Sequence, residues 1–375
     1  MKKIIIFLIV PFLFVFACQA NEPTDIIMDK IGNDLNNFKE NLPQDILDFL
    51  PEEIWNGNFN NLIDSNFNEA SLLDLTLDYL FLGLNSALKS FGAIMIIIII
   101  SSIFNTFSHS FSSSLVKASF SVSSSLCVAI VIFNICTSLA SSTSNYLSAL
   151  CNVMESFAPL MASLYVITGN ITSGGIANAS FVLFIAITER YLVAFMLPIV
   201  NICICFAIIK SFTSQYDFGG ISKIFKNTFT GVTIFVMSVF MFVLSCKNII
   251  SQTADSLSIK TAKFAISSFI PIIGSTVNDA LRTITSSLAI IKNSCGITAI
   301  IVVALLMLPI IISLLLYRLV LNISASVAKV LGCNNECGVI EEASSICGFL
   351  LVLVICTCIL FIFALTILIK TSVVL

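Results

Sequence analysis

The chain is dominated by long apolar windows that carry almost no charge, and these windows restrict the fold more than any other feature. A helix needs about 20 residues to cross about 30 Å of hydrocarbon. Windows near that length lie roughly at 83–104, 118–140, 146–168, 228–246, 297–317 and 346–369, with a longer one at 176–209. The composition agrees, because only 10% of the residues are charged, against about 25% in soluble domains.

The windows predict an all-α fold, a polytopic helical bundle in a membrane. They do not alternate between apolar and polar residues as barrel strands do, and backbone groups in lipid must bond within helices or closed barrels. About seven spans are expected, with one or two broken or re-entrant elements. The 176–209 window would be about 50 Å long as one helix, so we expect two pieces, or a short half-helix ending near Glu189 followed by a span.

Residues 1–20 are predicted to be a signal peptide. Lys2 and Lys3 precede an apolar run, and Cys18-Gln-Ala20 fits a cleavage site. Lipidation at Cys18 and an uncleaved anchor stay open. Each alternative places residues 21–83, an acidic and helical segment that we call the head, outside the cytoplasm. Residues 84–375 then form the multi-span membrane domain.

Two sets of lysines conflict under the rule that positive loops face the cytoplasm. The loop with Lys210, Lys223 and Lys226 and the loop with Lys247, Lys260 and Lys263 are separated by one predicted span. We therefore expect residues 255–296 to contain an amphipathic or re-entrant element.

Two polar interruptions are candidate helix breaks. In the first, Gly169, Gly174 and Gly175 lie in a stretch rich in Asn, Ser and Thr. It is either an ordinary polar loop or a broken helix of the kind that forms transporter sites. In the second, Pro271 removes a backbone donor and Gly274 loosens the chain.

A helix with one apolar face is expected after the second break. The contrasting stripe, which we call the Asp279 stripe, consists of Asn278, Asp279, Arg282 and Ser286. It fits a helix lying on the membrane surface. It equally fits a stripe that lines an aqueous path or contacts a partner.

Catalysis is not expected. The one histidine is His109, and it has no nucleophile motif around it. Cys333, Cys337 and Cys347 lack the ligand set of a zinc site, and no nucleotide-binding loop follows Gly175. We therefore expect no enzyme, no cofactor and no metal. The net charge of −3 gives no indication of nucleic acid binding.

The segment from Asp255 to Gly296 resembles the signature of the stage III sporulation protein AE family. The matching pieces are Thr-Ala-Lys-Phe264, Phe-Ile-Pro-Ile-Ile-Gly274, Asp279-Ala280 and Ile-Lys-Asn-Ser-Cys-Gly296. The resemblance extends to the signal peptide, the head, the stretch at residues 169–180 and the C-terminal spans. Ser275 departs from a glycine that relatives often have there.

The resemblance implies a role without catalytic residues. Family members belong to the stage III sporulation AA–AH machinery, which includes the AA ATPase, and act with stage II sporulation protein Q from the forespore. That machinery is thought to form a channel between mother cell and forespore that maintains the forespore and permits late gene expression. The implied location is the mother-cell membrane around the forespore, among membrane lipids, and a homo-oligomer stays open.

The alternative function is a stand-alone secondary transporter or permease for a small solute. Broken helices are compatible with both functions, but a transporter would often show inverted repeats and buried coupling carboxylates. No internal repeat is evident in the chain, and Glu155 and Asp279 are the candidate carboxylates.

Overall fold

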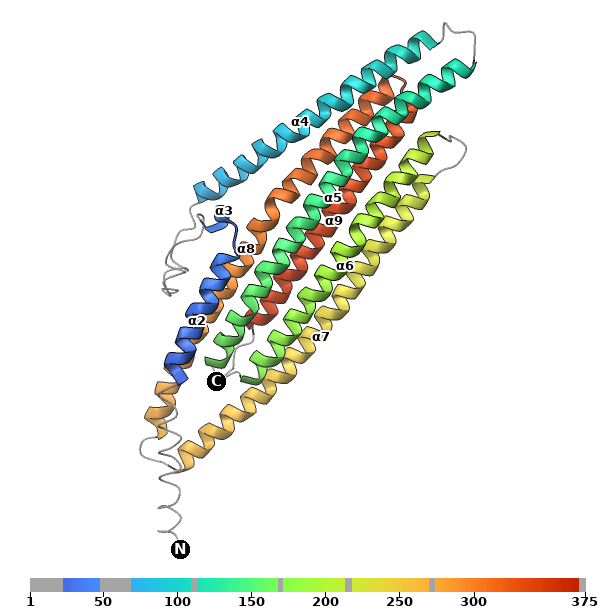
Figure 1. Ribbon diagram of the computed structural model, residues 1–375. Coiled ribbons are helices and arrows are strands. Elements are labelled where there is room, and N and C mark those ends of the chain that lie inside the picture. Colours follow the sequence, from blue (N-terminus) through green and yellow to red (C-terminus); the bar gives the residue numbers. More distant parts are fainter. Residues whose placement is uncertain are drawn as a thin grey trace.

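The computed structural model describes residues 23–47, 69–108, 114–167, 171–212, 218–269 and 274–370, and the described part is helical (Figure 1). The signal peptide predicted at residues 1–20 lies outside the described residues. In chain order the helices are α2 (Pro23–Glu40), α3 (Gln44–Leu47), α4 (Glu69–Ser108), α5 (Ser114–Ile167), α6 (Ile171–Phe212), α7 (Phe218–Phe269), α8 (Gly274–Val330) and α9 (Asn334–Lys370). The predicted all-α polytopic fold is confirmed.

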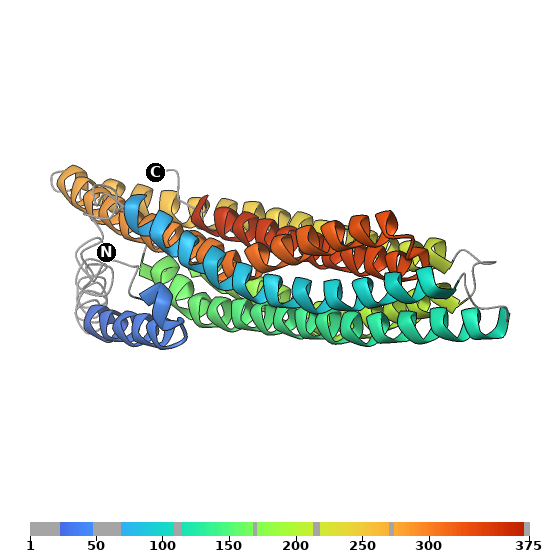
Figure 2. The same cartoon turned by 90° about the horizontal axis from the view of Figure 1, so that it is seen from above.

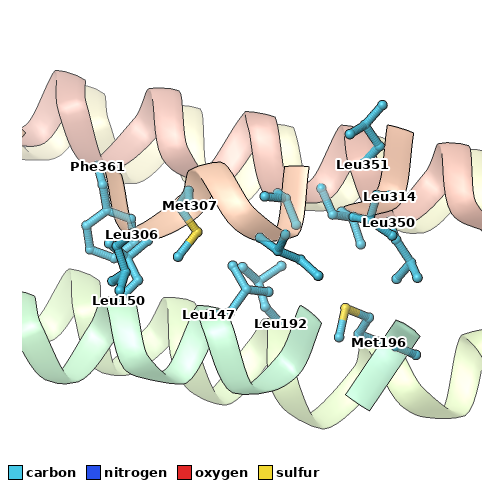
Figure 3. Close-up of a cluster of buried hydrophobic side chains, with 14 of the residues drawn as sticks. Leu147, Leu150, Leu192, Met196, Leu306, Met307, Leu314, Leu350, Leu351 and Phe361 are labelled. Atoms are coloured by element: carbon cyan, nitrogen blue, oxygen red, sulfur yellow. The ribbon is translucent and has the colours of Figure 1, made fainter. Parts of the chain in front are cut away.

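Helices α4 to α9 run up and down along one direction and form an elongated bundle (Figures 1 and 2). Helix α9 lies at its centre, in contact with α5, α6, α7 and α8, while α4 packs on α5 and α8. Apolar side chains of α5, α6 and α8 meet those of α9 (Figure 3). The labelled members of this core are Leu147, Leu150, Leu192, Met196, Leu306, Met307, Leu314, Leu350, Leu351 and Phe361, and all of them are buried.

In the described residues six helices are long and apolar enough to cross a membrane, one fewer than the sequence predicted. The expected spans 118–140 and 146–168 both belong to α5, a single helix of 54 residues. Large apolar side chains on α5 are exposed up to Phe133, and none is exposed again before Val166. Hydropathy overcounted the spans because both windows belong to one continuous helix, which hydropathy alone does not show.

Helix α6 is also continuous where the sequence predicted two pieces. It runs from Ile171 to Phe212 through Pro198 without interruption. The helices of this bundle are longer than a bilayer is thick: α8, with 57 residues, is about 85 Å long. The premise that 34 apolar residues must break to fit the membrane therefore does not hold here.

Helix α7 carries most of the lysines of the two conflicting sets. It has 52 residues, with Lys223 and Lys226 near its start and Lys260 near its far end, whereas Lys210 lies near the end of α6. One helix of about 78 Å is long enough to hold these charges more than a bilayer thickness apart, and it runs to Phe269 without a turn. Residues 255–269 continue α7, and residues 274–296 begin α8.

The head packs onto the bundle. Leu35, Phe38, Leu42 and Ile46 of the head are buried. The rings of Phe38 and Phe157 lie 5.4 Å apart, and Ser163 Oγ donates a hydrogen bond to Asp34 Oδ2 at 2.9 Å. Helix α4 passes through residue 83 without a break, so the last part of the head and the first span share one helix.

Helices α8 and α9 approach closely at Gly296, which yields a test of the packing. A Cβ at Gly296 would overlap Ile369 Cγ1 and lie 2.6 Å from its Cδ1. Gly296→Ala should gain helix propensity of about 1 kcal/mol but lose more to overpacking, which costs about 1–3 kcal/mol. We expect a lower melting temperature in detergent.

Gly92→Ala is the matched control, because nothing lies within 4 Å of a Cβ at that helical position. It should leave the melting temperature unchanged or raise it. If both variants melt at the same temperature, the close approach of α8 and α9 at Gly296 is refuted.

Candidate functional site

The Asp279 stripe lies on the first turns of α8. Asn278, Asp279, Arg282 and Ser286 follow Gly274, the first residue of the helix. This end of α8 and the end of α7 extend beyond the α5–α6 end of the bundle (Figure 1). The side chains of the stripe are outside the described set, so its role stays a prediction.

The candidate helix breaks lie at or near helix boundaries. Helix α5 ends at Ile167 and α6 begins at Ile171, and Gly169 falls in the undescribed residues between them. Gly174 and Gly175 lie inside α6 instead, in its first turns. Pro271 lies outside the described residues between α7 and α8, and Gly274 begins α8.

A polar face on α5 was not predicted from the sequence. Its members share an exposed position and a spacing of three, four or seven residues, which places them on one side of a helix. We call them the α5 stripe: Asn134, Ser138, Ser141, Asn145, Asn152 and Glu155. All six lie in the apolar segment Val122–Val166, which is long enough to span a membrane.

The α5 stripe needs a polar environment. Asn and Glu side chains that face acyl chains lose their hydrogen bonds to water, and polar groups in spans almost always face a bundle interior or a water-filled cavity. In this chain they point away from the core formed by Leu147 and Leu150. Where the stripe lies within the hydrocarbon layer, water or a neighbouring protein must therefore lie beside α5.

A second polar cluster joins α7 to α9. Lys226 Nζ donates to Glu342 Oε1 at 2.5 Å and to Ser345 Oγ at 2.7 Å. Ser222 Oγ donates to the same carboxylate oxygen. The side chains of Lys226 and Glu342 are 5% and 12% exposed, so the pair lies largely out of contact with solvent.

This cluster lines a cavity of about 990 Å³ between α7, α8 and α9, which we call the Lys226 cavity. Its polar lining consists of Lys223, Lys226, Asn227, Thr230, Arg318, Glu342 and Ser345. Its apolar lining consists of Ile234, Phe349 and Val352. Gly220, Gly231 and Gly348 complete the wall and leave room because they have no side chains.

The sequence contains one signal for this site. Glu341 and Glu342 stand close before the apolar run of α9, and a carboxylate in such a segment usually has a partner. Lys223 and Lys226 look in the sequence only like markers of a positive loop. The pairing itself could not be inferred, because Lys226 and Glu342 are 116 residues apart in the chain.

The described residues contain no group of three or more His, Cys, Asp or Glu side chains that could hold a metal ion. The described cysteines are free thiols, and many of them are buried, including Cys136, Cys295 and Cys347. Their arrangement is that of small apolar side chains in helix packing.

Removing one partner of the buried pair should destabilise the fold. Lys226→Met leaves the Glu342 carboxylate without its cation, and Glu342→Gln leaves the ammonium without its anion. Each single variant should lose about 3–5 kcal/mol of stability, and the double variant should lose less than the sum of the two. Thermal unfolding in detergent measures the difference.

Lys247→Met is the control on the same helix, because Lys247 is exposed, and it should have little effect. The two charges do not stabilise each other if the single variants are as stable as the wild type. The same holds if the stability lost by the double variant equals the sum of the two single losses.

Comparison with known proteins agrees with the resemblance seen in the sequence. The family model described as stage III sporulation protein AE matches residues 55–372. The stage III sporulation protein AE of Bacillus subtilis (strain 168) is 25% identical over 244 residues, which are 62% of this chain and 59% of that relative. The alignment thus covers less than two thirds of the relative's length. No solved structure matches the chain.

The family match runs from the undescribed part of the head to the end of α9 and includes all six candidate spans. Because it covers most of the sequence, the chain belongs to the stage III sporulation protein AE family.

Proposed function

We propose that this protein is a non-enzymatic membrane subunit of a sporulation-specific channel or secretion-like complex that links mother cell and forespore. In this role it is required for forespore maintenance and late forespore gene expression. The family membership supports the sporulation context. The six apolar helices support a multi-pass subunit in the membrane.

The observation that carries the channel role is the α5 stripe. A protein that only anchors a complex has no need for six exposed polar residues along a membrane helix, and their exposure is costly in lipid. A subunit that lines an aqueous path, or that packs against another subunit, has such a need. The stripe extends from Asn134 to Glu155, about 32 Å along the helix, and it follows directly on the exposed apolar face of α5 that ends at Phe133.

The proposed partners are the other stage III sporulation AA–AH proteins and stage II sporulation protein Q. The AA ATPase supplies energy, which fits the lack of a nucleotide-binding loop in this sequence. The Asp279 stripe is the proposed contact for an extracytoplasmic partner, because that end of the bundle extends beyond its neighbours (Figure 1).

The proposed orientation places the head and the α7–α8 end outside the cytoplasm. The α4–α5, α6–α7 and α8–α9 connections then lie inside. Lys223, Lys226, Arg318 and Lys329 are on the side of these connections, as the positive-inside rule prefers. The acidic head is on the opposite side.

Co-purification from sporulating cells tests the proposed complex. The full-length chain should retain other stage III sporulation proteins, and a double variant with Asp279→Ala and Arg282→Ala should lose at least one of them at unchanged membrane abundance. Uptake of a small solute by this protein alone in liposomes, with no co-purified partner, would contradict the proposal and favour the transporter.

Thiol labelling tests the α5 stripe and the orientation together. Ser138→Cys and Asn145→Cys, in a chain without native cysteines, should react with a charged, membrane-impermeant reagent because water reaches the stripe. Leu126→Cys and Ile130→Cys are controls on the same helix, since both side chains are exposed and apolar, and should stay protected by lipid.

In the same assay Asn37→Cys should react in intact cells, and Asn334→Cys should react only after permeabilisation. Protection of the whole α5 stripe in the assembled complex would refute a water-lined path. Labelling of Asn334→Cys in intact cells would reverse the orientation.

A further inference from the structure

The Lys226 cavity carries more positive charge than its one carboxylate balances. Lys226 is paired with Glu342. Lys223 and Arg318 also line the cavity, are exposed, and form no ion pair with a described residue. Two cations are therefore available at its mouth.

The position of Arg318 favours an anionic ligand. Arg318 lies in the candidate span Lys292–Val330, and its neighbours Leu315 and Leu319 are 48% and 55% exposed. That surface of α8 is typical of a helix facing acyl chains. An arginine on such a surface is costly unless it reaches the interface or meets an anion.

Arg318 is held directly over the backbone of α9. A Cβ at Gly348 would lie 3.2 Å from Arg318 Cζ and 3.4 Å from its Nε. The missing side chain at Gly348 thus allows the guanidinium to lie in the cavity. A guanidinium with free N–H donors matches the geometry of a phosphate.

The cavity is polar near the α6–α7 and α8–α9 connections and apolar further along the helices. On α7, Ile234 lies about 16 Å beyond Lys223, and on α9, Val352 lies about 15 Å beyond Glu342. Both helices run away from these connections in the same direction (Figure 1). A ligand with an anionic end and apolar chains fits this order.

We propose that the Lys226 cavity binds the phosphodiester headgroup of an anionic glycerophospholipid, with Lys223 and Arg318 contacting the phosphate. The acyl chains lie along Ile234, Phe349 and Val352. The Lys226–Glu342 pair keeps α7 and α9 together behind the headgroup. Basic pockets between membrane helices on the cytoplasmic side bind lipid headgroups in this way. The site depends on the membrane-embedded fold and on no sporulation partner.

The test uses the purified full-length protein in a neutral detergent. Phosphatidylglycerol is titrated against phosphatidylcholine with the same acyl chains, and against inorganic phosphate. Melting temperature and native mass spectrometry report binding, since a ligand that binds only the folded state raises the melting temperature. Phosphatidylglycerol should raise it saturably, and the other two probes should not.

Variants then assign the binding to this cavity. Lys223→Gln and Arg318→Gln should each weaken phosphatidylglycerol binding about fivefold. Gly348→Ala should also weaken it, because the new methyl group displaces the guanidinium without removing its charge. Gly338→Ala on α9, where nothing lies within 4 Å of a Cβ, is the matched control and should bind like the wild type. If Lys223→Gln and Arg318→Gln do not fold, the difference in phosphatidylglycerol affinity between Gly348→Ala and Gly338→Ala tests the site.

Several results would overturn the proposal. An equal rise in melting temperature with phosphatidylcholine and phosphatidylglycerol would show that the headgroup charge is not recognised. An equal rise with inorganic phosphate would show that the acyl chains are not needed. Unchanged affinity in the double variant of Lys223 and Arg318, or equal affinity in the two glycine variants, would place the lipid elsewhere. Loss of a co-purified protein by Arg318→Gln with unchanged lipid affinity would assign the cavity to an acidic protein segment.

Discussion

The structure depends on the burial of α9 among four other helices. Backbone groups of a span must be bonded within the helix, so the specificity of a membrane bundle comes from the way its side chains pack. Leu350 and Phe361 supply large apolar side chains to this core, and Gly296 on α8 allows one close approach. Helices α5 to α8 surround α9 because each contributes one apolar face to it. Helix α4 and the head are attached to this assembly from outside.

The length of the helices is the second constraint. A bilayer occupies about 30 Å, and α8 is nearly three times as long. Parts of α7 and α8 therefore stand outside the hydrocarbon layer, and the head covers the part of α5 around Phe157. A region outside the hydrocarbon layer is thus built from the same helices as the membrane region.

Charged and polar groups divide into two kinds in this bundle. Lys226 and Glu342 satisfy each other inside the protein, and removing either one would leave a buried charge without its partner. The α5 stripe and Arg318 are exposed instead, and their requirement for a polar neighbour extends beyond a single chain. In a membrane, the polar groups that can contact them are those of other proteins, water and lipid phosphates. These exposed polar groups therefore indicate where the protein meets its surroundings.

The sequence by itself determined the all-α membrane fold and the family, because both depend on local properties: apolar runs of sufficient length and a motif at residues 255–296. It also predicted a helix break near Pro271, which lies outside the described residues between the end of α7 and the start of α8. The tertiary structure decided that α5 is one helix whose exposed face changes from apolar to polar after Phe133, since the sequence does not show which face of a helix is covered. It also decided that Lys226 meets Glu342 and that the α5 stripe forms one exposed face, because pairing and exposure arise only when helices distant in the sequence pack together.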